Sequence, residues 1–362
     1  MFQIKKQIRK LYSSSVLGSL SLTGAWVAIL AARGYSLVEI GFVETVFHIT
    51  SLIFEIPSGV LADVFGRKRM LLVSTLMRMV ANVIMIASAN LFMVCLSIVF
   101  MALSYNFSSG SGDALAYDSL KMAGQESRFE RYESNQLTIY RLCDGLSTLC
   151  AGFALTIGHR LAYGTGLITG AVQLMVIGGL SEICPGERGG GERLMKRLAR
   201  CFRESFAFVG KARKALGLML CNSLVGAVDI LLLFFLQAKL PERGIPAWGL
   251  GPALLLMQLG GILGSRLIVK LPRIRYGWMF LLSSGLVLTG FLLEHSPLYW
   301  VMALGGFLSA MGDDALQVRT NAILQDMFPS EQRATLTSID SFSFSVVMIV
   351  LSPLAGLVFS HW

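Results

Sequence analysis

Charged residues are scarce in this chain, and their scarcity indicates the class of protein. Of the 362 residues, 15% are charged and 54% are hydrophobic, and the mean hydropathy is +0.65. A soluble globular domain carries about 25% charged residues. Long apolar stretches inside a bilayer must be helical, because hydrocarbon cannot satisfy unpaired backbone groups. The composition therefore predicts an all-α membrane protein.

Several signatures of catalysis and metal binding are also missing. The six cysteines contain no Cys-x-x-Cys pair, which argues against a disulfide framework or a zinc site. The sequence has no G-x-x-x-x-G-K-[ST] phosphate loop and no H-E-x-x-H pair. The Gly110-Ser111-Gly112 stretch lacks the spacing of a nucleophile elbow. We therefore expect no enzyme activity, no metal and no cofactor.

Apolar runs of about 20 residues predict eleven membrane-spanning helices. They cover residues 11–32, 38–62, 70–89, 92–117, 136–158, 163–183, 215–238, 247–269, 277–294, 297–318 and 336–360. One connection, 184–214, is Gly-rich and then basic, a composition suited to an anionic membrane surface. It is predicted to be a cytoplasmic linker between an N-terminal six-helix half (1–183) and a C-terminal half of about five helices (215–362).

The distribution of Lys and Arg predicts the orientation. With the N-terminus inside, 24 of the 31 basic residues fall in cytoplasmic segments, and the outer loops hold only Arg33, Arg160, Lys239 and Arg243. Basic residues concentrate on the cytoplasmic side of membrane proteins. We therefore expect a multi-pass protein of the cell membrane with a cytoplasmic N-terminus. The net charge of +9 is assigned to these flanks and not to nucleic-acid binding.

The two halves resemble each other in spans four and ten. Gly112-Asp113 corresponds to Gly312-Asp313 at an offset of 200 residues, together with a Phe and a Ser at the same offset. Parallel six-span repeats are a known transporter architecture. Because an ionisable residue inside a span is costly, a repeated Gly-Asp pair indicates a shared role.

Span two ends in Gly59-Val60-Leu61-Ala62-Asp63-Val64-Phe65-Gly66-Arg67-Lys68-Arg69. This stretch resembles the loop 2–3 signature of the major facilitator superfamily, G-x-L-A-D-x-x-G-R-K, at every defined position. The resemblance extends to the span count, the linker, the orientation and the repeat, and so covers essentially the whole chain. It implies a bundle of two pseudo-repeated halves around a central cavity.

The resemblance also implies a conformational latch at Gly59, Asp63, Gly66, Arg67, Lys68 and Asp118. Gly59 is expected to allow close helix approach, and Gly66 a tight turn. Asp63 is expected to accept hydrogen bonds from the N-terminus of span eleven. Arg67 is expected to pair with Asp118, although this basic run could serve only as a topology anchor. The matching stretch of the second half, 260–266, has no Asp.

The remaining charges inside spans are candidates for coupling or for lining a cavity. They are Asp113, Asp313, Asp229, Glu55, His48, Asp144 and Arg141. For Asp113 and Asp313 the alternative is a packing role. Arg141 and Asp144 are three residues apart and could simply pair with each other. His48 shares a helix face with Glu44 and Glu55, as a polar stripe or a proton-handling group.

The sequence predicts a monomeric secondary transporter that moves a small solute by alternating access. Proton-coupled efflux of a drug-like or amphipathic compound is the first hypothesis, and uptake of a sugar or other small metabolite is an alternative. The family fold has twelve spans, one more than predicted here. A truncated product without transport activity, or a membrane sensor on a transporter fold, therefore stays open.

Overall fold

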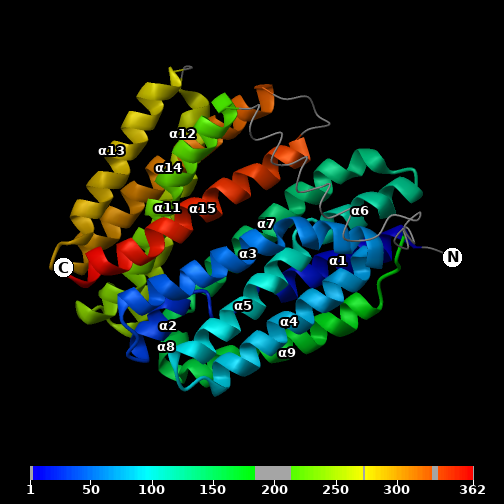
Figure 1. Cartoon of the computed structure of the whole chain (residues 1–362), viewed down its shortest axis with the longest axis horizontal. Coiled ribbons are helices and arrows are strands. Elements are labelled where there is room, and N and C mark those ends of the chain that lie inside the picture. Colours follow the sequence, from blue (N-terminus) through cyan, green and yellow to red (C-terminus); the bar gives the residue numbers. More distant parts are fainter. Residues whose placement is uncertain (1–2, 184–212, 272–273, 328–332, 362) are drawn as a thin grey trace. The chain divides into compact units, whose positions relative to one another are not determined.

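The architecture is entirely helical in the described residues, which are 3–183, 213–271, 274–327 and 333–361 of a computed structural model (Figure 1). The all-α fold class predicted from composition is confirmed. In chain order the α-helices are α1 (Ile4–Ser19), α2 (Trp26–Ala32), α3 (Leu37–Phe65), α4 (Arg67–Ala87), α5 (Leu91–Ser108), α6 (Ser111–Met122), α7 (Phe129–Leu149), α8 (Ala151–Ile157), α9 (His159–Gly178), α11 (Arg213–Glu242), α12 (Ala247–Lys270), α13 (Tyr276–Glu294), α14 (Tyr299–Met327) and α15 (Arg333–Ser360). A short 3₁₀ helix, η1 (Glu126–Arg128), precedes α7.

In the described residues, eight helical segments are long and apolar enough to cross a membrane. The predicted count of eleven is not confirmed as such. Span 11–32 is interrupted between α1 and α2, and span 136–158 divides into α7 and α8. Helix α14 is long enough, but Asp313 and Asp314 lower its hydropathy.

Predicted span four is not continuous. It consists of α5 and α6, with a break at Gly110, whose φ of +69° lies in the left-handed region that favours glycine. The break places Asp113 in the first turn of α6. Carboxylates are favoured at that end of a helix by the exposed N–H groups and the helix dipole.

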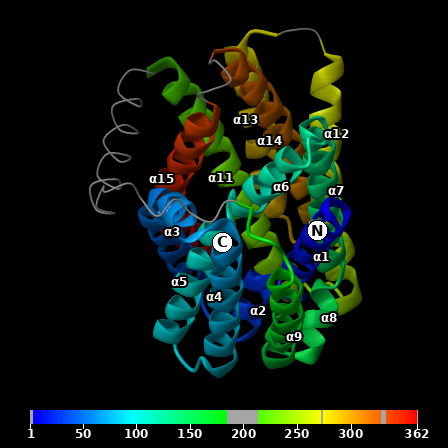
Figure 2. The same cartoon turned by 90° about the vertical axis from the view of Figure 1, so that its right-hand side faces the viewer.

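One compact unit comprises Met1–Gly24, Ile49–Ser147 and Ile157–Glu204. In it α4 packs against α5 and α9, and α1 packs against α9 (Figures 1 and 2). Arg78 of α4 joins these helices, because its guanidinium donates to the Gly18 carbonyl and to the Gln173 side chain. Gln173 in turn donates to the Ser14 carbonyl at 2.9 Å. This intramembrane charge therefore has a structural role.

The second compact unit comprises Ala25–His48, Thr148–Thr156 and Ser205–Trp362. Helix α14 is central in it and packs against α11, α12 and α13. Glycines allow these close contacts, because small residues let helix backbones approach each other. A Cβ on Gly290 of α13 would lie 2.6 Å from the carbonyl oxygen of Gly305 in α14.

The two units differ from the predicted halves. Residues 25–48 and 148–156 group with helices of the predicted C-terminal half. Glycine contacts explain this grouping, since Gly41 abuts the Ser352 carbonyl and Gly152 abuts that of Ala247. The predicted linker, 184–214, lies outside the described residues except for its last two positions.

Candidate functional site

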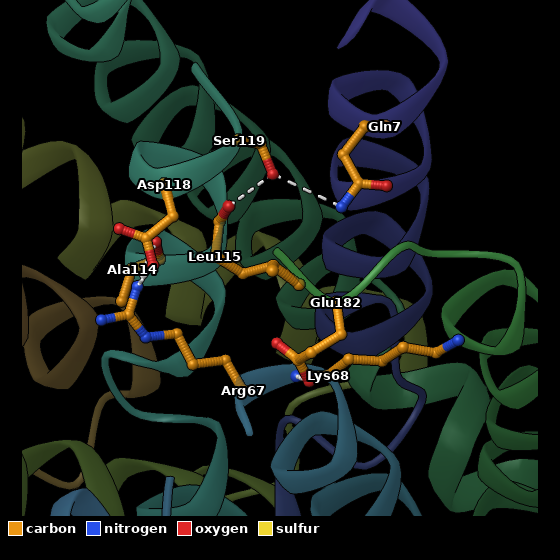
Figure 3. Close-up of polar contacts among 8 residues, drawn as sticks. All are labelled: Gln7, Arg67, Lys68, Ala114, Leu115, Asp118, Ser119 and Glu182. Atoms are coloured by element: carbon orange, nitrogen blue, oxygen red, sulfur yellow. Dashed lines mark hydrogen bonds and ion pairs between the residues drawn. The ribbon is translucent and has the colours of Figure 1, made fainter. Parts of the chain in front are cut away.

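Arg67, the first residue of α4, pairs with the carboxylate of Asp118 in α6 (Figure 3). Its Nη1 also donates to the Ala114 carbonyl at 2.7 Å. Both side chains of the ion pair are mostly buried, which strengthens a charge-assisted hydrogen bond. The pairing expected from the resemblance is thus present, while its role as a latch stays a prediction.

Glu182 is a member of this cluster that sequence analysis missed. Its carboxylate accepts a 2.9 Å hydrogen bond from the backbone N–H of Lys68 in the first turn of α4 (Figure 3). The Lys68 ammonium donates to the Gly178 carbonyl at 2.8 Å. Gly66 caps α4 with φ at +95°, and a Cβ there would lie 2.6 Å from the Glu182 carboxylate. The glycine therefore supplies both the turn and the space for this carboxylate.

The side-chain amide of Gln7 in α1 makes hydrogen bonds in the same region through both its nitrogen and its oxygen. Its Nε2 donates to the Ser181 carbonyl at 2.8 Å, and its Oε1 accepts from the Ser181 N–H at 3.0 Å. The same nitrogen lies 3.4 Å from the hydroxyl of Ser119 in α6. Buried at 3% exposure, Gln7 fixes α1 against α6 and the end of α9.

The remaining predicted latch residues have a different outcome. The side chain of Asp63 lies outside the described part of the structure, so its expected contact with span eleven stays a prediction. Gly59 has no described atom within 4 Å of the position its Cβ would occupy. The expected close helix approach at Gly59 is therefore not found among the described residues. Of the two glycines in this motif, Gly66 is the one whose Cβ position is already occupied by a neighbouring side chain.

Asp229 of α11 lies in a buried polar contact of the second unit. Its Oδ1 accepts a 2.6 Å hydrogen bond from the hydroxyl of Ser309 in α14, and both residues are buried. One turn before Asp229 on α11 and one turn after Ser309 on α14, a Cβ on Gly226 would lie 3.2 Å from the Asp313 carboxylate. Helices α11 and α14 therefore bring Asp229 and Asp313 to one shared surface, on the spacing of three and four residues that defines a helix face.

Glu294, the last residue of α13, is buried beside this surface. Its exposed fraction is 1%, and neither carboxylate oxygen has a hydrogen-bond partner in the described residues. The side chain lies over Gly305 and Gly306 of α14, with Oε1 3.5 Å from the Cβ position of Gly306. Ser309 follows one turn later on the same face. Glu294 is not predictable from the sequence as a buried residue, because a charge at the end of a span is normally a surface residue.

Asp113 and Asp313, which sequence analysis paired as repeats, have different surroundings. Asp113 is exposed, and Gly112 has no described atom within 4 Å of its Cβ position. Asp313 is half-buried, and a Cβ on Gly312 would lie 2.9 Å from the Ser283 carbonyl. Close packing therefore accounts for the glycine before Asp313 and not for the one before Asp113.

The other candidates lie apart from these clusters. His48 is buried, with Nε2 3.2 Å from Glu44 Oε1 and Nδ1 3.3 Å from the Ser345 hydroxyl. Its ring also packs edge-on against Phe344. These contacts favour a structural role for His48. Glu55 follows two turns later on α3 and is half-buried.

Arg141 and Asp144 lie one turn apart on α7, where Arg141 is exposed and Asp144 is half-buried. The local ion pair expected for them stays a prediction.

Comparison with known proteins gives these clusters a family context. The model of the Major Facilitator Superfamily matches residues 11–129. The uncharacterized MFS-type transporter YxaM of Bacillus subtilis (strain 168) is 24% identical over 364 residues, which cover 96% of this chain and 88% of that protein. These two matches support a transporter of the major facilitator superfamily. The eight apolar helices and these matches together support a multi-pass membrane protein.

Solved structures of similar fold are themselves transporters. The nucleoside transporter NupG, in a mutant form, matches with a TM-score of 0.74 at 14% identity, over 99% of this chain and 96% of that one. A bacterial homologue of the lysosomal transporter Spinster gives 0.66 at 15% identity, over 97% and 79%. A D-xylose-proton symporter gives 0.64 at 13% identity, over 97% and 87%. At these identities the likeness shows the fold alone.

Proposed function

We propose that this superfamily transporter couples the movement of a small solute to protons, through the carboxylates of Glu294 and Asp229. The observation that carries the proposal is the buried carboxylate of Glu294, which has no hydrogen-bond partner in the described residues. An ionised carboxylate in that position costs several kcal/mol. A proton on Glu294 would remove this cost.

The groups around Glu294 support a proton as the ligand. Asp229 on α11 and Asp313 and Asp314 on α14 are acidic, and His295 is the neighbouring titratable group on α13. Among the other helices of this unit, α2 carries no ionisable residue. Arg266 of α12 is exposed, and Asp340 of α15 is half-buried. The amide oxygens of Asn222 and Gln237 on α11 also lack a partner in the described residues. The described part of the second unit therefore holds buried acceptors on α11 and α13 that lack a donor.

The order of these acids along the helices suggests a route. Gly306, Ser309 and Asp313 follow each other on one face of α14, and seven residues of helix span about 10 Å. The Glu294 side chain meets α14 at Gly306, and the Asp229 side chain meets it at Ser309. Asp313 is part of α14 and follows Ser309 by one turn. Chains of Asp, Glu and His residues inside membranes serve as proton relays. We place the coupling step on this series and leave Asp113, which is exposed, as a cavity-lining group.

The proposal also covers the orientation of the protein in the membrane, the direction of transport and the class of solute. We propose that the protein lies in the cell membrane with its N-terminus in the cytoplasm, and the distribution of Lys and Arg supports this orientation. Efflux of a drug-like or amphipathic compound is the direction proposed first. Uptake of a small metabolite is the second candidate, because the neighbours of known fold include a nucleoside transporter and a D-xylose-proton symporter.

The test uses the full chain reconstituted in proteoliposomes that contain a trapped pH dye. A panel of amphipathic compounds, nucleosides and sugars is applied with and without an imposed pH gradient. For any compound that is carried, we expect substrate-linked proton movement in the wild type and its loss in Glu294→Gln, with downhill exchange of the solute retained. Glu242→Gln, at an exposed carboxylate that pairs with Lys239, is the matched control and should keep coupling. Unchanged proton movement in Glu294→Gln would refute the proposal.

A further inference from the structure

A cavity of about 410 Å³ opens in the first unit, and every residue that lines it belongs to that unit. It is bounded by the beginning of α1, by the end of α6, by η1 and by the beginning of α7. Four basic side chains line it, Lys5, Arg9, Arg128 and Arg131, and none of the described residues that line it is acidic. The latch and the acidic series do not include any of these residues.

The basic residues reach the cavity from two sides. Lys5 and Arg9 are four residues apart and share a face of α1. Arg128 ends η1, and Arg131 follows it in the first turn of α7. All four are exposed, so the cavity can be reached from water. Converging cations without a carboxylate among them attract an anion, and Arg suits a phosphate because its planar guanidinium can donate two hydrogen bonds.

Two tyrosines form an ordered wall of the cavity. The rings of Tyr12 and Tyr132 are stacked with centroids 5.1 Å apart. The Tyr12 hydroxyl accepts from Asn135 at 3.0 Å, and the Tyr132 hydroxyl accepts from Gln136 at 2.6 Å. Each hydroxyl can still donate its own proton. Burial, with a smaller contribution from Asp113, raises the pKa of Tyr132 above its usual value, so this hydroxyl stays a neutral donor.

We propose that this cavity binds a phosphate group, held by Arg128 and Arg131 from one side and by Lys5 and Arg9 from the other. The phosphate can come from the headgroup of an anionic phospholipid or from a soluble phosphorylated anion. Basic pockets beside membrane-spanning helices on the cytoplasmic side suit anionic headgroups. Three aliphatic residues of the lining, Ile4, Ile8 and Leu120, add an apolar surface that suits the start of an acyl chain.

The experiment uses the purified full chain and two probes. In the first arm, the melting temperature is followed against inorganic phosphate, with chloride at matched ionic strength as the reference. In the second arm, the protein is placed in nanodiscs of equal phosphatidylglycerol and phosphatidylcholine, and bound lipid is counted by native mass spectrometry. A response in the lipid arm alone assigns the headgroup, and a response in the phosphate arm alone assigns a soluble anion. Either response supports the site.

The variant Arg128→Gln/Arg131→Gln tests the location. Each arginine near an anionic surface contributes roughly a five-fold change in affinity, so the pair should weaken binding roughly twenty-five-fold. Arg160→Gln, at an exposed arginine of α9, is the matched control and should bind as the wild type does. If the double variant does not fold, Lys5→Gln replaces it, and a five-fold loss is expected. Wild-type affinity in the folded variant, or an equal loss in Arg160→Gln, would overturn the proposal.

Discussion

The hydroxyl of Ser309 donates a 2.6 Å hydrogen bond to the carboxylate of Asp229, and both residues are buried between α11 and α14. A hydrogen bond to a charged group contributes about 1.5–3 kcal/mol, more than a bond between neutral groups. Ser309 therefore favours the ionised form of Asp229, in a region where burial favours the protonated form. The balance between the two is sensitive to this single hydroxyl.

Removing that hydroxyl should change the pH dependence of transport. In Ser309→Ala the ionised form of Asp229 loses its donor, so the proton is released only at higher pH. We expect the pH of half-maximal transport to rise by about one unit, since one unit corresponds to about 1.4 kcal/mol. The measurement is solute flux in proteoliposomes from pH 5 to 9. Ser283→Ala is the control, because Ser283 is equally buried and its hydroxyl has no partner in the described residues. An identical profile for both variants would show that Ser309 does not act on the coupling step.

The ion pair between Arg67 and Asp118 predicts a loss of transport without a loss of folding. Arg67→Gln and Asp118→Asn should each reduce the rate at least ten-fold, because each leaves a mostly buried charge without its partner. Membrane insertion and the size-exclusion profile should stay normal. Arg69→Gln is the control, since Arg69 belongs to the same basic run but is exposed. Transport at the wild-type rate in either variant would remove the latch hypothesis.

Two glycines of the same motif should respond differently to replacement by alanine. Gly66→Ala forces a left-handed φ on a residue with a Cβ and directs that Cβ at Glu182, so we expect destabilisation of about 1–3 kcal/mol. Gly59→Ala lies inside α3 with open space around it, so we expect no loss, or a gain of about 0.5–1 kcal/mol. Thermal unfolding in detergent measures both. Equal stability of the two variants would contradict the structure at Gly66.

Two glycines of α13, one at its contact with α14 and one with open space around it, allow a similar comparison. Gly290→Ala would bring a Cβ within 2.6 Å of the Gly305 carbonyl and 2.9 Å of Ser309, and should separate the two helices. Overpacking of this kind costs about 1–3 kcal/mol. Gly285→Ala on the same helix meets no described atom within 4 Å and should be tolerated. The pair can be compared by melting temperature and by proton-coupled flux, which should fall only in Gly290→Ala.

Much of this fold could be predicted from composition and from one motif. Apolar runs located most of the long helices to within a few residues, because hydrocarbon admits few other structures. The exceptions include α7, which begins well before its predicted span, and α14, which continues well beyond its own. The pairing of Arg67 with Asp118 followed from a motif in which residue types and spacing are both specific. Interruptions were harder to predict. Gly110 breaks span four, and its neighbours Ser109 and Ser111 are polar, but such a stretch also suits a continuous helix that faces water.

Glu182 and Glu294 could not be predicted because their roles depend on tertiary contacts. Glu182 lies 114 residues from the Lys68 N–H that it binds, at the edge of a predicted linker. Glu294 ends a span and is followed by His295-Ser296-Pro297, which is typical of an exposed turn. It is buried because Gly305 and Gly306 leave room for its side chain. The Gly-Gly pair of α14 is the sequence signal that could have indicated a large buried partner.

The two hydrogen bonds between Gln7 and Ser181 also constrain how the protein is made. They join residues 174 positions apart, so α1 cannot complete its contacts until the whole of α9 has been synthesised. At roughly 5–20 residues per second, that delay lasts on the order of 10–35 seconds. During this interval the buried amide of Gln7 has to find temporary partners in the membrane or in the insertion machinery. A substitution at Gln7 should therefore reduce the yield of inserted protein before it affects the finished transporter.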